Sequence, residues 1–179
     1  MIKLDFQQTF PPTWLEKDYS KMTFESPQED GSIETMVVKI DRHPAFNSPN
    51  VYNMGFGPPD MKGGFRDNVK LKHKDLGKVL STVLFHGNNF LQENSSLVLG
   101  IDGSDDVRAM LYHLITKVNR EYLSEFFTVF GVDWFIRVLR DGRLEIDENG
   151  RLISNPKPEI FDYQRSRHDL YRYYIFRLK

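Results

Sequence analysis

The sequence contains no cysteine, which excludes structural disulfides and thiolate metal sites. A reducing compartment is therefore the simpler assumption, and we expect a cytoplasmic protein. A signal peptide has a basic start followed by an apolar core. The first ten residues instead include Lys3, Asp5 and two glutamines, so we expect no signal peptide. Long hydrophobic runs are also missing. The most apolar long stretch, residues 126–139, is interrupted by Asp133 and Arg137 and is shorter than the roughly 20 residues of a membrane-spanning helix.

Strong charge and recognised catalytic motifs are absent as well. The formal net charge of -1 gives the whole molecule no electrostatic commitment to nucleic acid or to a membrane. The charge is unevenly distributed, however, because residues 1–40 carry four lysines against seven acids and residues 163–179 carry five cations against one acid. The five histidines show no spacing typical of zinc sites, and no serine nucleophile elbow or glycine-rich phosphate loop is present. We therefore expect no cofactor.

A helix, a buried strand and a second helix are the clearest pattern that is present, and they span Asp75 to Tyr122. Apolar residues recur at helical spacing from Leu76 to Leu91 and again from Val107 to Tyr122. Between them, residues 97–101 form an apolar run without polar alternation, which is typical of a strand covered on both faces. If this strand is a parallel neighbour of the one before the first helix, the helix is a crossover connection.

The remaining segments are mostly expected strands. We expect strands over residues 33–40, 51–56 and 171–178, a weaker one over 65–71, and one over 126–130 that ends at Gly131. The pairs Asp141-Gly142 and Asn149-Gly150 predict tight turns, and residues 154–163 an extended connection. The sequence thus predicts a single domain over residues 1–179, with an α+β fold in which two long amphipathic helices pack on one face of a mostly antiparallel sheet.

Three segments together resemble a family of small bacterial proteins, namely Asn50-Val51-Tyr52-Asn53-Met54-Gly55-Phe56-Gly57, Lys78-Val79-Leu80-Ser81-Thr82-Val83 and Gly103-Ser104-Asp105-Asp106-Val107-Arg108-Ala109-Met110-Leu111-Tyr112. It is a domain-of-unknown-function family, so the resemblance implies a fold more than an activity. It runs from about Val37 to Gly131 and resumes in the last strand. The chain departs from the family pattern at Pro58, Pro59 and Met110, and residues 134–168 look like an addition.

The turn after the buried strand holds Asp102, Asp105 and Asp106, and such a turn is where α/β proteins often place ligands. Three carboxylates in a compact turn suit a divalent cation. Alternatively, Ser104 caps the following helix while the acids complement its positive end. Arg108 opposes that end of the helix, so it has a separate role, either pairing with Asp105 or contacting a ligand or partner.

Two basic segments suggest a nucleic-acid surface, in which cations hold phosphates and aromatic rings stack on bases. The first carries Lys70, Lys72 and Lys74, close to Arg66, His73 and Lys78. The second carries Arg165, Arg167 and Arg172, together with tyrosines 163, 171, 173 and 174. The alternative is a solvated face beside a half-buried aromatic strand, since no recognised nucleic-acid motif accompanies the charge.

We therefore expect a non-enzymatic binding or interaction module whose partner is a protein or a nucleic acid. A role in defence or in mobile-element conflict would suit such a bacterial family by analogy alone. The alternative function is a metal-dependent hydrolase or nuclease that uses Asp102, Asp105 and Asp106, with Arg108 stabilising charge. A further hypothesis is a homodimer formed through the aromatic last strand, if that strand is an exposed sheet edge.

Overall fold

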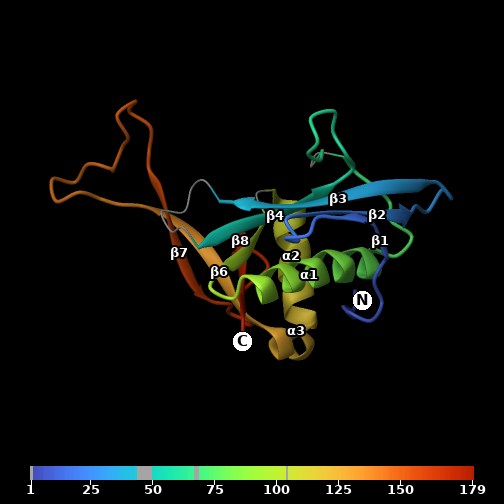
Figure 1. Ribbon diagram of the computed structural model, residues 1–179. Helices are drawn as coiled ribbons and strands as arrows, with labels where there is room; N and C mark the ends of the chain where they lie inside the picture. The colour runs from blue at the N-terminus through green and yellow to red at the C-terminus, as the bar shows by residue number, and fades with distance from the viewer. Residues whose placement is uncertain (1, 44–49, 67–68, 104) are drawn as a thin grey trace.

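The computed structural model describes residues 2–43, 50–66, 69–103 and 105–179, and it contains eight strands and three helices (Figure 1). The strands are β1 (Pro12–Leu15), β2 (Lys21–Pro27), β3 (Ile33–Arg42), β4 (Val51–Gly57), β5 (Val98–Asp102), β6 (Phe127–Ile136), β7 (Ser154–Ile160) and β8 (Tyr173–Leu178). The helices are α1 (Leu76–Glu93), α2 (Asp106–Val118) and α3 (Arg120–Phe126). The α+β class is confirmed.

All eight strands belong to one sheet, in the order β1-β2-β3-β4-β5-β8-β6-β7. Only β4 and β5 pair in parallel, with Val51 opposite Val98, and every other pair is antiparallel. Because α1 connects these two parallel neighbours, it is the crossover that the sequence suggested. The sheet twists strongly, so that β6 and β7 run steeply across the direction of β1 to β4 (Figure 1).

The helix from Leu76 is confirmed, and the Asp75 side chain caps it by accepting a hydrogen bond from the Lys78 amide. The second helix is not one continuous helix to Tyr122. It ends at Val118, and α3 begins after Asn119. In the Asn119 side chain, Nδ2 donates to the Ile115 carbonyl, and Oδ1 accepts from the Leu4 backbone amide 2.8 Å away. The helix breaks because this side chain binds backbone groups of two segments at once.

The segment before β1 has no regular structure, and helix side chains hold its backbone. Four of its amides donate to them: Leu4 to Asn119, Asp5 to Ser81, Phe6 to Tyr122 and Phe10 to Thr82. These bonds replace the sheet or helix bonds that a buried backbone otherwise needs. They fix residues 4–10 against α1 and α3.

The prediction that Gly131 ends a strand is wrong. β6 continues through Gly131 to Ile136, and Gly131 lies opposite Glu159 of β7 and Tyr174 of β8. A Cβ atom at this position would collide with the Tyr171 ring. Gly131 is therefore a strand residue whose missing side chain makes room for a buried tyrosine.

The prediction that the last strand is an exposed edge is also wrong. β8 lies between β5 and β6, and both of its edges carry antiparallel pairs. Alternate residues point to opposite faces, with Tyr174 and Phe176 in the larger core cluster and Tyr173 and Ile175 in a smaller one. Because no free edge remains on this strand, it cannot pair with its copy in a homodimer.

Other differences concern segments with weak or mixed patterns. The sequence did not predict β1 and β2, and residues 65–71 form no strand in their described part. The segment predicted as an extended connection over residues 154–163 pairs with β6 over residues 154–160 and forms β7. The two turn predictions are confirmed, because Val138 pairs with Leu144 and Ile146 with Leu152, with Gly142 and Gly150 at positive φ. These turns form an arm over residues 137–153 that projects from the body (Figure 1).

The larger core cluster includes side chains from the N-terminal segment, from all three helices and from six of the strands, such as Met36, Val83, Leu99 and Leu123. The smaller cluster is Val51, Val132, Tyr173 and Ile175. No helix in the described part of the chain is long and apolar enough to span a membrane.

We expect Gly131→Ala to lower the free energy of unfolding by about 1–3 kcal/mol, because the added methyl group forces the Tyr171 ring out of its place. Chemical denaturation followed by circular dichroism measures this loss. Gly64→Ala is the control, since the nearest atoms to its Cβ are those of the Asp60 side chain. Equal stability of the Gly131 variant and the wild type would contradict this account of the strand.

Candidate functional site

The acidic turn after β5 forms the start of α2. Asp105 is the N-cap, and its Oδ1 accepts a hydrogen bond from the Arg108 amide at 2.8 Å. Its other oxygen pairs with the Arg108 Nε at 3.1 Å, which is the i, i+3 pair that the sequence suggested. Ser104, the residue that we expected as the cap, lies outside the described residues. The cap is therefore supplied by a carboxylate of the turn itself.

A metal site is not assembled from these carboxylates. Within residues 2–43, 50–66, 69–103 and 105–179, no three His, Asp or Glu side chains lie in an arrangement that could hold a metal ion. Asp105 is occupied as described, and Asp106 pairs with Arg172 at 2.6 Å. Asp102 is exposed at the end of β5. The turn is a helix start balanced by two arginines rather than a converging set of oxygens.

Arg108 lies beside Tyr112 on the same face of α2. Burial raises the pKa of Tyr112 to about 12, and the positive charge of Arg108 acts in the opposite direction.

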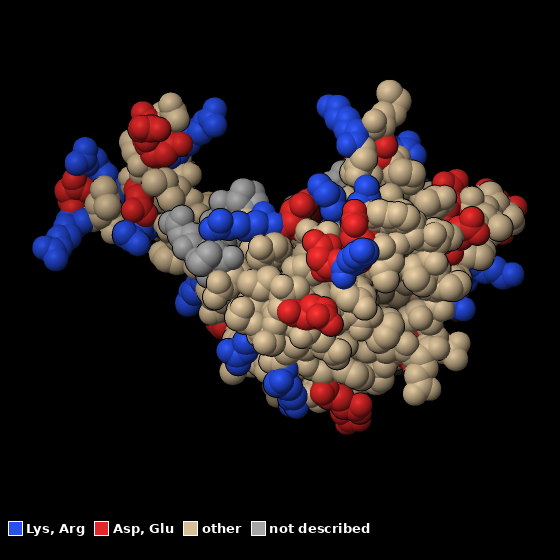
Figure 2. Space-filling view, viewed as in Figure 1, with Lys and Arg blue, Asp and Glu red and all other residues tan. Residues whose placement is uncertain are grey.

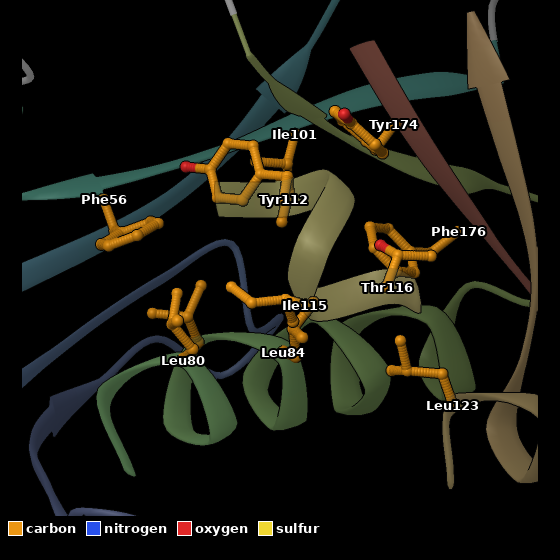
Figure 3. Close-up of a pocket in the computed structure, with 11 residues that line it drawn as sticks. Phe56, Leu80, Leu84, Ile101, Tyr112, Ile115, Thr116, Leu123, Tyr174 and Phe176 are labelled. Atoms are coloured by element: carbon orange, nitrogen blue, oxygen red, sulfur yellow. The ribbon is translucent and has the colours of Figure 1, made fainter. Parts of the chain in front are cut away.

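Tyr112 also lines a narrow gap between α1, α2 and the sheet (Figure 3). The gap is apolar, with Leu80, Ile101 and Phe176 among its walls, and its volume of about 20 Å³ suits little more than one water molecule. It is space within the core.

Arg165 is part of a network that holds the C-terminal loop. Its side chain is 11% exposed and makes two bonds to Asp133, at 2.8 and 3.0 Å. It also binds Asp169 and Glu159, and its guanidinium group stacks 3.8 Å from the centre of the Tyr171 ring. A planar group with this many partners is fixed in place. Arg165 therefore has a structural role in this fold.

The C-terminal tyrosines are not available for base stacking. Tyr171, Tyr173 and Tyr174 are each at most 1% exposed, and Tyr163 stacks on Arg120. Arg172 is exposed but paired with Asp106, and Arg167 is exposed. The structure therefore does not bring the predicted second basic segment together as a surface of cations and free rings.

The first basic segment does present its lysines to solvent. Residues 72–74 continue the sheet beyond the end of β2, because Glu29 donates to the Lys72 carbonyl and Lys74 donates to the Pro27 carbonyl. In such an extended chain, alternate side chains point in opposite directions. Leu71 packs on the core and His73 is half-buried, so Lys70, Lys72 and Lys74 are the exposed set.

His73 anchors this segment. Its Nδ1 lies 2.8 Å from the Ser26 hydroxyl and 3.2 Å from the amide nitrogen of Gln28, and both of these partners are buried. Since the Gln28 amide nitrogen is a donor, the Nδ1 atom of neutral His73 acts as an acceptor. Burial lowers the pKa of His73, which keeps the ring neutral at pH 7. This role could not be predicted from local sequence patterns, because Ser26 and Gln28 lie far from His73 along the chain.

Across the face seen in Figure 2, lysine and arginine side chains alternate with acidic ones, and no single basic patch covers it. Positive side chains also lie on the two projections, which are the arm and the loop after β4 (Figures 1 and 2). That loop carries the exposed residues Lys62 and Arg66 shortly before the lysine segment. Among the predicted site residues, Lys70, Lys72 and Lys74 are thus the group whose side chains lie close together in the sequence and are all exposed.

We expect Arg165→Met to lower the free energy of unfolding by about 2–4 kcal/mol, because it leaves Asp133, Glu159 and Asp169 without their shared cation. Urea denaturation measures the loss. Arg167→Met is the matched control, since that side chain is exposed, and it should stay within about 0.5 kcal/mol of the wild type. Similar stabilities of the two variants would argue against the structural role of Arg165.

We expect His73→Gln to reduce the loss of stability on acidification. Because the pKa of His73 is lowered in the folded state, the unfolded chain binds a proton first as the pH falls below about 6.5. The stabilisation from His73 is complete above that pH and decreases as the pH falls toward the folded-state pKa. Unfolding free energies at pH 7 and pH 5 test this, with the exposed His168→Gln as control. An unchanged pH dependence in His73→Gln would contradict it.

In the comparison with known protein families, residues 8–139 match a family of unknown function (DUF6934). This range ends before β7 and β8, although β8 completes the centre of the sheet. No curated protein and no solved structure matches the chain. The match covers most of the sequence and confirms the resemblance to a domain-of-unknown-function family, so the chain belongs to the family DUF6934.

Proposed function

We propose that this protein is a non-enzymatic binding module that holds a nucleic acid through the lysine segment, residues 70–74. The observation that carries the proposal is the exposure of Lys70, Lys72 and Lys74 at alternate positions, with Leu71 packed on the core and His73 half-buried between them. Residues 72–74 extend the sheet, so Lys72 and Lys74 are about 6.6–6.8 Å apart along the chain. A regular row of cations suits a partner with a regular row of negative charges.

Contacts with phosphates explain this arrangement better than contacts with bases. Lysine ammonium groups act as point charges toward phosphates, and the lysines alternate with Leu71 and the half-buried His73 rather than with exposed aromatic rings. Binding of this kind depends on salt and only weakly on base sequence. Lys62 and Arg66 on the preceding loop offer further positive charge to the same partner.

We also propose that α1 and α2 pack on the same face of the sheet. It is supported by the larger core cluster, in which Leu80 of α1 and Ile115 of α2 occur together with Leu99 and Phe176 of the sheet. For the location, we propose the cytoplasm of a bacterial cell, which agrees with a sequence free of cysteine.

The hydrolase alternative at Asp102, Asp105 and Asp106 has less support. Two of these carboxylates already bind Arg108 and Arg172, and a metal ion would have to displace both arginines. A protein partner with an acidic surface is the competing partner for the lysine segment, and the experiment below distinguishes the two.

We expect the triple variant Lys70→Gln, Lys72→Gln, Lys74→Gln to lose affinity for labelled single-stranded RNA and DNA. If each lysine neutralises one phosphate, the slope of log K against log salt becomes less negative by about 2, at about 0.7 for each contact. Fluorescence anisotropy between 25 and 200 mM salt, on the order of one decade of concentration, measures this slope. The variants should fold normally because the three side chains are exposed.

The matched control removes three exposed cations from the arm and β7, as Arg140→Gln, Arg151→Gln, Lys157→Gln. Both triple variants change the net charge equally, so only a local effect separates them. Equal loss in the two variants would mean that overall charge governs binding. No binding by the wild type at the lowest salt concentration would remove the nucleic acid as the partner.

A further inference from the structure

A second cavity lies between the N-terminal segment, the β1–β2 hairpin and α1, and its volume is about 100 Å³. Its walls are mainly apolar and include Phe10, Leu15, Met22 and Phe85. Pro11, Pro12 and Leu15 are exposed at its outer side, so the cavity is accessible from solvent there. This space is several times what one water molecule needs. It could hold a small organic molecule.

One buried polar atom in the cavity lining has no partner. His86 is 2% exposed, and its Nε2 atom makes no hydrogen bond within the part of the chain that the structure describes. Burial lowers the pKa of His86 to about 4, whereas a backbone hydrogen bond to Tyr19 raises it. A bond that favours the protonated ring is one that the ring donates, here from Nδ1 to the Tyr19 carbonyl. Nε2 of the neutral ring is then an acceptor.

The other polar groups near His86 do not satisfy it. Thr82 also lines the cavity, but its hydroxyl donates to the Lys78 carbonyl at 2.7 Å and accepts from the Phe10 amide at 2.8 Å. Leaving a buried acceptor without a donor is costly, and native structures rarely do so without a reason. Thr9 and Asn89 also line the cavity, so its walls are mainly but not wholly apolar, and Nε2 of His86 is the buried acceptor in the lining that has no partner in the described chain.

Ring contacts hold the walls of the cavity in place. The Phe10 ring stacks on Phe24 with centroids 5.8 Å apart, and the Lys78 ammonium group lies 4.7 Å from the centre of the Phe10 ring.

The Tyr19 ring packs beside His86, with ring centroids 6.1 Å apart. The Tyr19 backbone has a φ of 58°, which is unusual for a residue other than glycine. Backbone strain of this kind often occurs where a ligand is held.

We propose that this cavity binds a small uncharged molecule with a flat apolar body and one O–H or N–H group, which donates to Nε2 of His86. Phenol has this chemistry. An apolar cavity of about 150 Å³ holds benzene, so a cavity of about 100 Å³ that is accessible from solvent is of suitable size for one small ring. The site is independent of the lysine segment.

The experiment compares phenol with toluene, which has a methyl group in place of the hydroxyl. Phenol is uncharged at pH 7. Titrations followed by ¹H–¹⁵N spectra should show saturable binding of phenol, with shifts at Phe10, Tyr19 and Phe85 and at the ring nitrogens of His86. In His86→Leu, the affinity for phenol should fall by about tenfold while the affinity for toluene is retained, because only the acceptor is lost.

A second variant, Leu15→Trp, fills the cavity from its exposed side and should abolish binding of both molecules, with the fold checked by circular dichroism. It keeps the test decisive if His86→Leu does not fold. Three results would overturn the proposal: no saturable binding of phenol by the wild type, an equal effect of His86→Leu on phenol and toluene, or unchanged phenol binding in Leu15→Trp. The last result would place the bound molecule elsewhere.

Discussion

The position of β8 between β5 and β6 is the constraint on which the rest of the structure depends. The strand nearest the C-terminus joins the part of the sheet built from β1 to β5 to the part built from β6 and β7. Gly100 makes room for Tyr173 of β8 and Gly131 makes room for Tyr171, which precedes the strand, because a Cβ atom at either glycine would collide with that ring. The sheet is therefore complete only when residues far apart in the sequence have met, which makes its formation strongly non-local.

This constraint explains why several charged residues have structural roles. Tyr171, two residues before β8, packs under the guanidinium group of Arg165, which in turn holds Asp133 of β6. Arg172 leads into the same strand and pairs with Asp106 at the start of α2. Cations that looked available for a partner are thus used to fix the last strand to its neighbours. The lysine segment lies outside this network, at the end of β2, and retains its side chains in solvent.

The half-buried His73 and the buried His86 differ in whether a hydrogen-bond donor of the protein faces the acceptor nitrogen of the ring. Nδ1 of His73 has donors from Ser26 and Gln28, so the ring closes a local network and orients the lysine segment. Nε2 of His86 has no such donor among the described residues and lines a cavity instead. Burial lowers the pKa of both rings, so both are neutral acceptors near pH 7. The same residue type closes a hydrogen-bond network in the first case and lines a cavity in the second.

The sequence by itself determined the local elements whose signal repeats within a few residues. Apolar spacing identified α1 and β5, and the Asp-Gly and Asn-Gly pairs identified the turns of the arm. The three segments at residues 50–57, 78–83 and 103–112 identified the family. The alternation of Met22 and Phe24 in β2 was a usable signal that the surrounding polar residues obscured. Only the tertiary structure decided that Gly131 continues a strand, that Asn119 divides a helix, that the last strand is central and that His86 lines a cavity. Each of these depends on a partner distant in sequence, and local patterns contain no information about which distant groups will meet.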